Sequence, residues 1–100
     1  MVADVHFFAD DNPSLVAEKA LRVNLSDLAS MAAEPVGYLL SLALPKHDFD
    51  RENWVKEFST GLQENQSRFN WRLWGGDTVS TTGPITISVT AIGLVEQGKV

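Results

Sequence analysis

The sequence contains no cysteine and few basic residues. Without cysteine, neither a disulfide framework nor a thiolate metal site can form. Lysine and arginine number 8 against 13 aspartates and glutamates, which gives a formal net charge of −5, and the basic residues form no cluster. Because nucleic-acid binding needs a basic surface, we expect no nucleic-acid partner. If the chain handles phosphates, metal ions must supply the positive charge.

Long apolar runs are also missing. The longest mostly apolar stretch, Val36 to Leu44, is too short to span a bilayer. The first residues, MVADVHFF, lack the basic region that opens a signal peptide. We therefore expect no membrane partner and a cytoplasmic location, which the lack of cysteine supports weakly.

The 100 residues suffice for one domain, and 44% hydrophobic with 21% charged residues is an ordinary globular balance. A strand is predicted almost at the first residue, and another ends close to the last. This abruptness indicates a segment of a longer protein.

Local signals predict the order strand, helix, strand, helix, strand, strand. Asn12 and Pro13 are typical of a helix start, and Pro35 of a helix end. Asp48 or Asp50 is expected to begin the second helix. The predicted strands are 2–8, 36–44, 71–74 and 85–95, and the predicted helices run from 13 to about 33 and from about 50 to 69.

This order favours an α+β fold in which two helices cover one face of a mostly antiparallel sheet. The last strand alternates apolar residues with threonine and serine, a pattern typical of a half-buried strand. Its long edge predicts a neighbouring subunit, because such edges rarely stay exposed.

Asp27 falls on the apolar side of the first predicted helix. On a helical wheel, Val16, Ala20, Val23 and Met31 all lie within about 40° of it. Burial of an unpaired carboxylate costs several kcal/mol, so a cation, a metal or several donors must compensate. The alternative is an aspartate near a helix end that backbone donors satisfy.

Two further positions are candidates for chemistry. Gly75, Gly76 and Asp77 follow a short predicted strand, where glycines permit close approach of a ligand and an aspartate can bind a hard metal. A plain tight turn explains the same residues. His6 lies in the first predicted strand, where a core histidine is the simpler interpretation.

Three stretches resemble the thiamine-monophosphate kinase family, and together they span nearly the whole chain in the family's order. Lys19 to Pro35 (KALRVNLSDLASMAAEP) is similar to the family's KALAVNLSDLAAMGAxP. Val2 to Phe7 is similar to a strand that ends in VxGxHF. Leu73 to Thr78 is similar to the GGDT motif, and Gly83-Pro84 with a strand follow as in the family.

The resemblance implies a member of the aminoimidazole ribonucleotide synthetase superfamily. Its members share an N-terminal α+β domain that dimerises through its sheets, so a homodimer is expected. The implied activity transfers the γ-phosphoryl group of ATP to thiamine monophosphate, with magnesium. By resemblance, Asp27 and Asp77 are magnesium ligands, Gly76 and Asp77 lie near the nucleotide phosphates, and His6 contacts the thiamine phosphate.

Residues 1–100 would then be part of the N-terminal ATP- and magnesium-binding and dimerisation domain, without the family's C-terminal domain. The chain departs from the family at Asp4 and Ala32, where the family usually has glycine, and in the turn Val79 to Thr82. Two alternatives stay open. One is a dimerisation or ligand-binding module without catalysis, and the other is a different ATP-dependent member of the superfamily.

Overall fold

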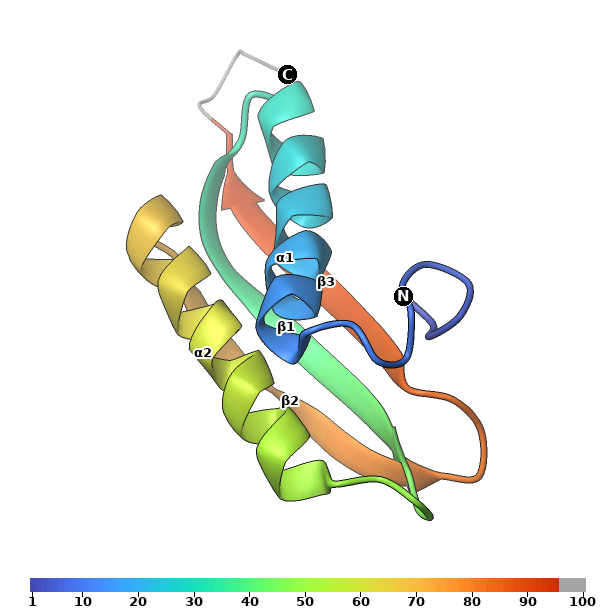
Figure 1. Cartoon of the computed structure of the whole chain (residues 1–100). Helices are drawn as coiled ribbons and strands as arrows, with labels where there is room; N and C mark the ends of the chain where they lie inside the picture. Colours follow the sequence, from blue (N-terminus) through green and yellow to red (C-terminus); the bar gives the residue numbers. More distant parts are fainter. Residues whose placement is uncertain (96–100) are drawn as a thin grey trace.

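The computed structural model describes residues 1–95, which form two helices and three strands (Figure 1). In chain order these are α1 (Pro13–Ser30), β1 (Glu34–Pro45), α2 (Arg51–Phe69), β2 (Arg72–Thr81) and β3 (Thr86–Leu94). The second helix and the strands β1 and β3 lie close to their predicted ranges, so the α+β class is confirmed.

The sheet has the order β2-β1-β3, with β1 at its centre. β1 pairs with β2 in parallel and with β3 antiparallel. The predicted mostly antiparallel sheet is confirmed only in part, because one of its two strand pairs is parallel. The cause is α2, which carries the chain back so that β2 starts at the same end as β1.

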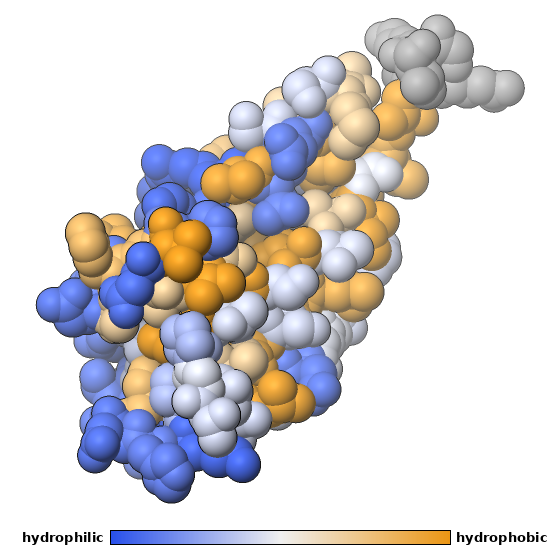
Figure 2. Space-filling view, turned by 90° about the vertical axis from the view of Figure 1, so that its right-hand side faces the viewer, coloured by the Kyte–Doolittle hydropathy of each residue, from blue (hydrophilic) through white to orange (hydrophobic). Residues whose placement is uncertain are grey.

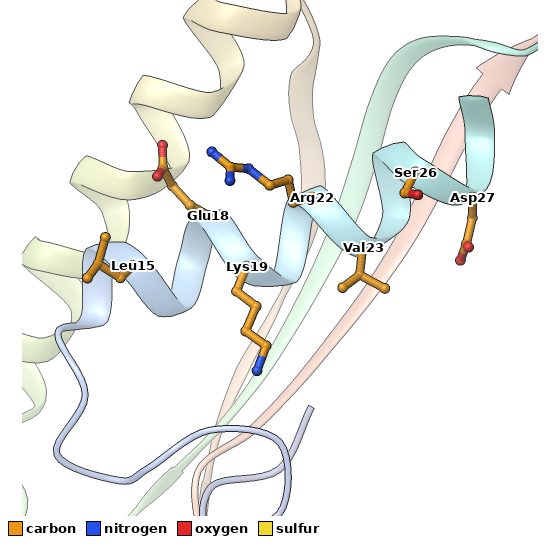
Figure 3. Close-up of a pocket in the computed structure, with 7 residues that line it drawn as sticks. All are labelled: Leu15, Glu18, Lys19, Arg22, Val23, Ser26 and Asp27. Carbon is orange, nitrogen blue, oxygen red and sulfur yellow. The ribbon is translucent and has the colours of Figure 1, made fainter. Parts of the chain in front are cut away.

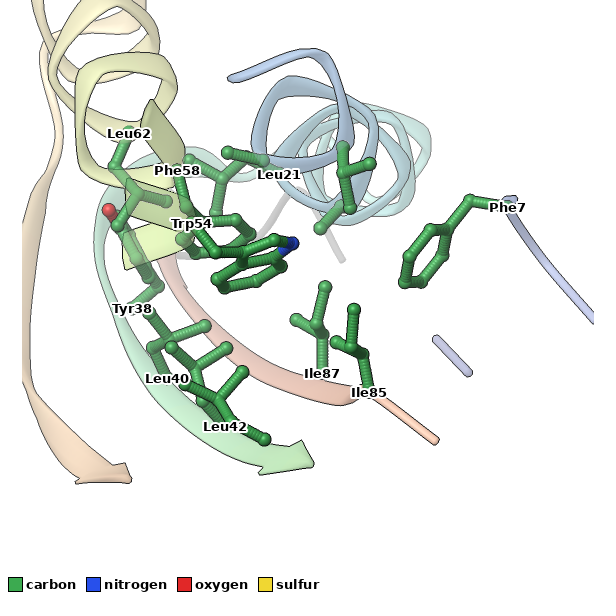
Figure 4. Packing of buried hydrophobic residues seen from close by; sticks show 14 of the residues in the cluster. Phe7, Leu21, Tyr38, Leu40, Leu42, Trp54, Phe58, Leu62, Ile85 and Ile87 are labelled. Carbon is green, nitrogen blue, oxygen red and sulfur yellow. The ribbon is translucent and has the colours of Figure 1, made fainter. Parts of the chain in front are cut away.

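Both helices cover the same face of the sheet, as expected (Figure 1). Along β1 the side chains alternate: Tyr38, Leu40, Leu42 and Leu44 are buried, whereas Ser41 between them is exposed. Figure 4 shows Tyr38, Leu40 and Leu42 of this row against side chains of both helices. The buried helix residues in this core include Val16, Ala17, Ala20, Leu21, Trp54, Phe58 and Leu62.

The two helices cross closely at Gly61. A Cβ on Gly61 would lie 2.3 Å from the backbone oxygen of Ser14 and 2.9 Å from the Cβ of Ala17. Only a residue without a side chain allows this approach, so Gly61 sets the distance between α1 and α2.

Each helix begins directly after a residue whose side chain caps it. The side chain of Asn12 accepts a hydrogen bond from the Ser14 amide at 3.0 Å, and Pro13 occupies the first helical position. Asp50, one of the two predicted starts, caps α2 by accepting from the Asn53 amide at 3.2 Å. These short-range signals predicted the first start, and they narrowed the second to two residues, of which Asp50 is the cap.

α1 ends at Ser30, three residues before the predicted end. Ala32 adopts a left-handed conformation with φ 54°. The Ala32 amide donates to the Ala29 oxygen at 3.0 Å, and the Ala33 amide donates to the Leu28 oxygen at 2.9 Å. These two bonds form a Schellman motif, which stops the helix before Pro35 can do so.

The predicted first strand, 2–8, does not form. Val2 makes one isolated bridge to Thr86, and Ala3 makes another to Phe7. Asp4 has φ 62°, and the His6 amide donates back to the Val2 oxygen at 3.0 Å. This local turn bends the segment back on itself instead of extending it along the sheet.

β2 is longer than predicted, and it contains the glycine pair. The strand continues from Arg72 through Gly75 and Gly76 to Thr81, so the expected turn at the glycines is wrong. An irregular register between Tyr38 and Leu39 of the partner strand accommodates this stretch. The chain reverses only after Thr81.

Candidate functional site

Asp27 lies on α1 but is exposed, so the expected buried carboxylate is a wrong prediction. Val23 and Met31, assigned to the same apolar side, are 53% and 57% exposed. The buried side of the helix is centred about 60° away from Asp27 on the wheel. It consists of Val16, Ala17, Ala20, Leu21 and Leu28.

A groove of about 550 Å³ follows this exposed side of α1 and includes Asp27 (Figure 3). Lys19, Val23 and Asp27 point to one side of the helix, whereas Glu18 and Arg22 point to the other. Lys19 and Arg22 were missed by the sequence reasoning. Their spacing of three residues on one helix predicts neighbouring cations, but the two side chains point to opposite sides of α1.

His6 lies in the N-terminal turn beside this groove and is exposed. Its Nδ1 accepts a hydrogen bond from the Val2 amide at 2.9 Å, and the Lys19 ammonium donates to its backbone oxygen. A neutral imidazole that accepts at Nδ1 carries its proton on Nε2, which can donate to a phosphate. Lys19 thus connects the turn that contains His6 to the helix that carries Asp27.

Asp77 lies on the face of the sheet that is opposite the two helices. It pairs across β1 with Ser41, which is exposed between buried Leu40 and Leu42, and Ser41 pairs in turn with Ser88 of β3. Because side chains alternate along a strand, Asp77, Ser41 and Ser88 form a polar row on the face that the helices leave uncovered.

The two candidate metal ligands do not converge within one chain. Asp27 is next to Leu28, which packs against Gly93, while Asp77 lies in the row of Ser88. Gly93 and Ser88 are five residues apart, or about 17 Å along β3. Ligands of one magnesium ion all lie about 2 Å from it, so Asp27 and Asp77 of one chain cannot share an ion.

No larger metal-binding group forms in the described part of the chain. Among residues 1–95, no three or more histidine, cysteine, aspartate or glutamate side chains gather in a way that could hold a metal ion. Asp27 and Asp77 each offer a single exposed carboxylate.

Gly76 has a structural role that is independent of any ligand. A Cβ at this position would lie 1.7 Å from the Leu40 backbone oxygen, and its φ is +156°. β2 can therefore pair with β1 only because residue 76 lacks a side chain. At Gly75 the nearest atom, Leu39 Cδ2, would be 4.0 Å away, so space does not constrain that position.

The uncovered face of the sheet carries exposed apolar side chains. Trp74 is 54% exposed, and its indole lies over Gly37, where a Cβ would be 2.4 Å from the ring. Leu39 and Val79 are 42% and 48% exposed. These residues surround the polar row of Asp77, so this face combines apolar area with a central carboxylate.

Tyr38 is fully buried beneath α2, with its ring centroid 4.7 Å from that of Trp71. Its hydroxyl has no hydrogen-bond partner among the described residues. Burial raises the pKa of Tyr38 from 10.0 to about 12. Trp71 is satisfied, because its indole Nε1 donates to buried Asn65 at 2.8 Å.

The family model described as AIR synthase related protein, N-terminal domain, matches residues 1–95. The chain belongs to this family. The match covers almost the whole chain, including the α1 groove and the row of Asp77.

Curated relatives of the chain are named thiamine-monophosphate kinase. The protein of Caulobacter vibrioides is 46% identical over 99% of this chain, and that of Escherichia coli K12 is 41% identical over 99%. The chain spans 28% and 29% of the length of these two relatives.

Solved structures agree with this grouping. The thiamine-monophosphate kinase of Stenotrophomonas maltophilia matches with a TM-score of 0.88 and 38% identity, over 98% of this chain and 29% of that one. The Aquifex aeolicus protein, described as AaThiL complexed with AMPPCP and TMP, matches with a TM-score of 0.87 and 30% identity. The match covers 93% of this chain and 29% of that one.

The two departures noted in the sequence now have a physical meaning. Asp4 and Ala32 stand where the resemblance implies glycine, and both adopt a positive φ, of 62° and 54°. Glycine reaches this region without strain, whereas aspartate tolerates it moderately and alanine poorly. Neither helix within residues 1–95 is long and apolar enough to cross a bilayer.

Proposed function

We propose that the chain is part of the N-terminal domain of an enzyme that transfers the γ-phosphoryl group of ATP to thiamine monophosphate. The observation that carries this is 41–46% identity to thiamine-monophosphate kinases over 99% of the chain. The ligands of AaThiL, AMPPCP and TMP, support ATP and thiamine monophosphate as the two substrates. The need for ATP also supports a cytoplasmic location.

The α1 groove is the proposed phosphate-handling region. His6 binds the phosphate of thiamine monophosphate through its Nε2 proton. Lys19 holds the His6 backbone from the side of α1 that also carries Asp27. Phosphoryl transfer depends mainly on positioning and on neutralising charge, which these side chains can supply without a covalent intermediate.

Magnesium is the proposed metal. It commonly binds one or two protein carboxylates, together with water and substrate phosphates, so the single carboxylates of Asp27 and Asp77 fit its donor preference. Because one chain keeps them apart, each serves a different ion or meets the other across two copies, with further ligands from outside residues 1–95. A bound magnesium ion would neutralise phosphate charge.

Gly76 and Asp77 are the proposed nucleotide contacts on the uncovered face. Gly76 lets β2 lie against β1, and the exposed carboxylate of Asp77 follows it on the uncovered face. The exposed apolar residues around them, with Trp74 the largest, also support a homodimer that covers this face. Sedimentation of the chain as a monomer at high micromolar concentration would contradict a dimer built by these residues alone.

A chimeric enzyme tests the proposed activity. The corresponding segment of the Caulobacter vibrioides kinase is replaced by residues 1–100, and formation of thiamine diphosphate is measured with ATP, magnesium and thiamine monophosphate. We expect activity within about tenfold of the parent, a loss of at most about 1.4 kcal/mol. A folded chimera that binds ATP but makes no thiamine diphosphate would refute the assignment.

The same assay separates the alternatives. The chain by itself is expected to be inactive, because both substrates and metals must be held together with water excluded. Turnover by residues 1–100 at the parent's rate would contradict that. Activity of the chimera on another phosphate acceptor, but not on thiamine monophosphate, would favour a different member of the superfamily.

A further inference from the structure

The tip of the N-terminal turn, residues 4–6, protrudes between two anchors. Before it, the Ala3 amide donates to the Ile85 oxygen at 2.9 Å, and after it Phe7 is buried in the core. Val5, in the tip itself, is 74% exposed. Figure 2 faces the side of the molecule that carries this turn, where hydrophilic side chains separate the apolar ones. Packing alone therefore fixes the tip weakly.

Lys19 of α1 supplies the contact that the tip otherwise lacks. Its ammonium donates to the backbone oxygen of His6. Within the described part of the chain, the other hydrogen bonds of residues 4–6 stay between residues 2 and 9. Figure 3 shows the Lys19 side chain extending from the helix toward the N-terminal segment. Among residues 1–95, Lys19 is therefore the side chain of another element that holds the tip by a hydrogen bond.

The imidazole of His6 is coupled to the backbone that Lys19 holds. Its Nδ1 accepts from the Val2 amide at 2.9 Å, and the His6 amide donates back to the Val2 oxygen at 3.0 Å. These two bonds orient the ring relative to the turn and place its proton on Nε2. A displacement of the His6 backbone therefore moves the Nε2 proton as well.

We propose that Lys19 is a positioning residue for thiamine monophosphate, which holds the His6 backbone so that the Nε2 proton of His6 meets the phosphate. This inference rests on the proposed function, and it adds a residue that acts through another side chain. The effect should be confined to one substrate, because the proposed nucleotide contacts at Gly76 and Asp77 belong to β2 and the face of the sheet that the helices leave uncovered. Loss of Lys19 should weaken binding of thiamine monophosphate and spare ATP.

Lys19→Met in the chimeric enzyme removes the ammonium and keeps a long side chain. We expect KM for thiamine monophosphate to rise at least about fivefold, with kcat and KM for ATP within about twofold, because a preorganised binding contact is lost. Lys19→Arg keeps a cationic donor and should recover most of the loss. Lys56→Met makes the same change at an exposed position of α2 and should leave all three constants unchanged.

A His6→Ala background separates positioning from direct contact with the phosphate. If Lys19 acts through His6, Lys19→Met should raise KM for thiamine monophosphate by less than about twofold in that background. An equal rise with and without His6 would show that the ammonium binds the phosphate itself, and it would overturn the proposal. An equal rise in KM for ATP would also overturn it, since that indicates general damage to the fold.

Amide hydrogen exchange in residues 1–100 tests the positioning without any activity. Lys19→Met should speed exchange of the His6 amide at least about fivefold and leave Leu40, in the central strand, within about twofold. Lys56→Met should change neither amide. Unchanged exchange at His6 in Lys19→Met would overturn the proposal. An inactive parent chimera would refute the proposed function instead, and exchange at His6 would then decide by itself whether Lys19 holds the turn.

Discussion

Replacement of Ala32 by glycine should stabilise the chain. Ala32 ends α1 in a left-handed conformation with φ 54°, and its side chain is exposed. A left-handed conformation costs an L-residue other than glycine about 1–2 kcal/mol. Glycine loses about 0.4–1 kcal/mol more than alanine through the entropy of the unfolded chain. The net expectation is a gain of about 0.5–1 kcal/mol, because both Schellman hydrogen bonds remain.

Ala29→Gly is the matched control, since it makes the same chemical change three residues earlier. Ala29 is also exposed, but it lies inside α1. Glycine there should cost about 0.5–1 kcal/mol, because it loses backbone entropy without relieving strain. The two variants should therefore move in opposite directions.

Urea unfolding, followed by circular dichroism, measures both free energies. For a domain of this size, 1 kcal/mol corresponds to about 4–8 °C in melting temperature, so the two variants should melt several degrees apart. The slope with urea should stay unchanged. If Ala32→Gly destabilises the chain as much as Ala29→Gly does, the left-handed strain at Ala32 does not exist and the reasoning fails.

Three further substitutions test other parts of the structure. Gly76→Ala should lower the free energy of unfolding by at least about 2 kcal/mol, because the added Cβ forces β2 away from β1. Gly83→Ala is the control, since a Cβ there would meet only the Thr81 hydroxyl at 3.6 Å, and it should change the free energy by less than about 0.5 kcal/mol. Equal losses in the two variants would contradict the predicted clash at Gly76. Tyr38 titrates at about 12, so the free energy of unfolding should be intact below pH 10 and fall as the pH rises from 10 to 12, by up to about 2.7 kcal/mol. Tyr38→Phe should abolish that alkaline loss, and since the chain has one tyrosine, absorbance at alkaline pH reports its ionisation directly; an unchanged loss in the variant would place its cause elsewhere. In the active chimera, Asp27→Asn should lower kcat/KM at least about tenfold if Asp27 binds magnesium, and wild-type kinetics would reject that role.

Several features followed from the sequence, because they depend on neighbours in the chain. Asn12 and Asp50 cap their own helices through side chains that reach amides two or three residues away. The alternation in β3 marks a strand whatever its partner. The family motifs are likewise contiguous stretches, which is why the resemblance could be read without a structure.

The tertiary structure decided the features that depend on distant residues. The glycines of β2 predicted a turn, but pairing with β1 draws them into a strand, where Gly76 is needed against Leu40. Asp27 predicted a buried carboxylate, but the helical wheel cannot tell which side of α1 will meet α2 and the sheet. α2 and the sheet contact a side centred between Ala17 and Ala20 and leave Asp27 exposed, so the carboxylates of Asp27 and Asp77 end on different faces of the domain.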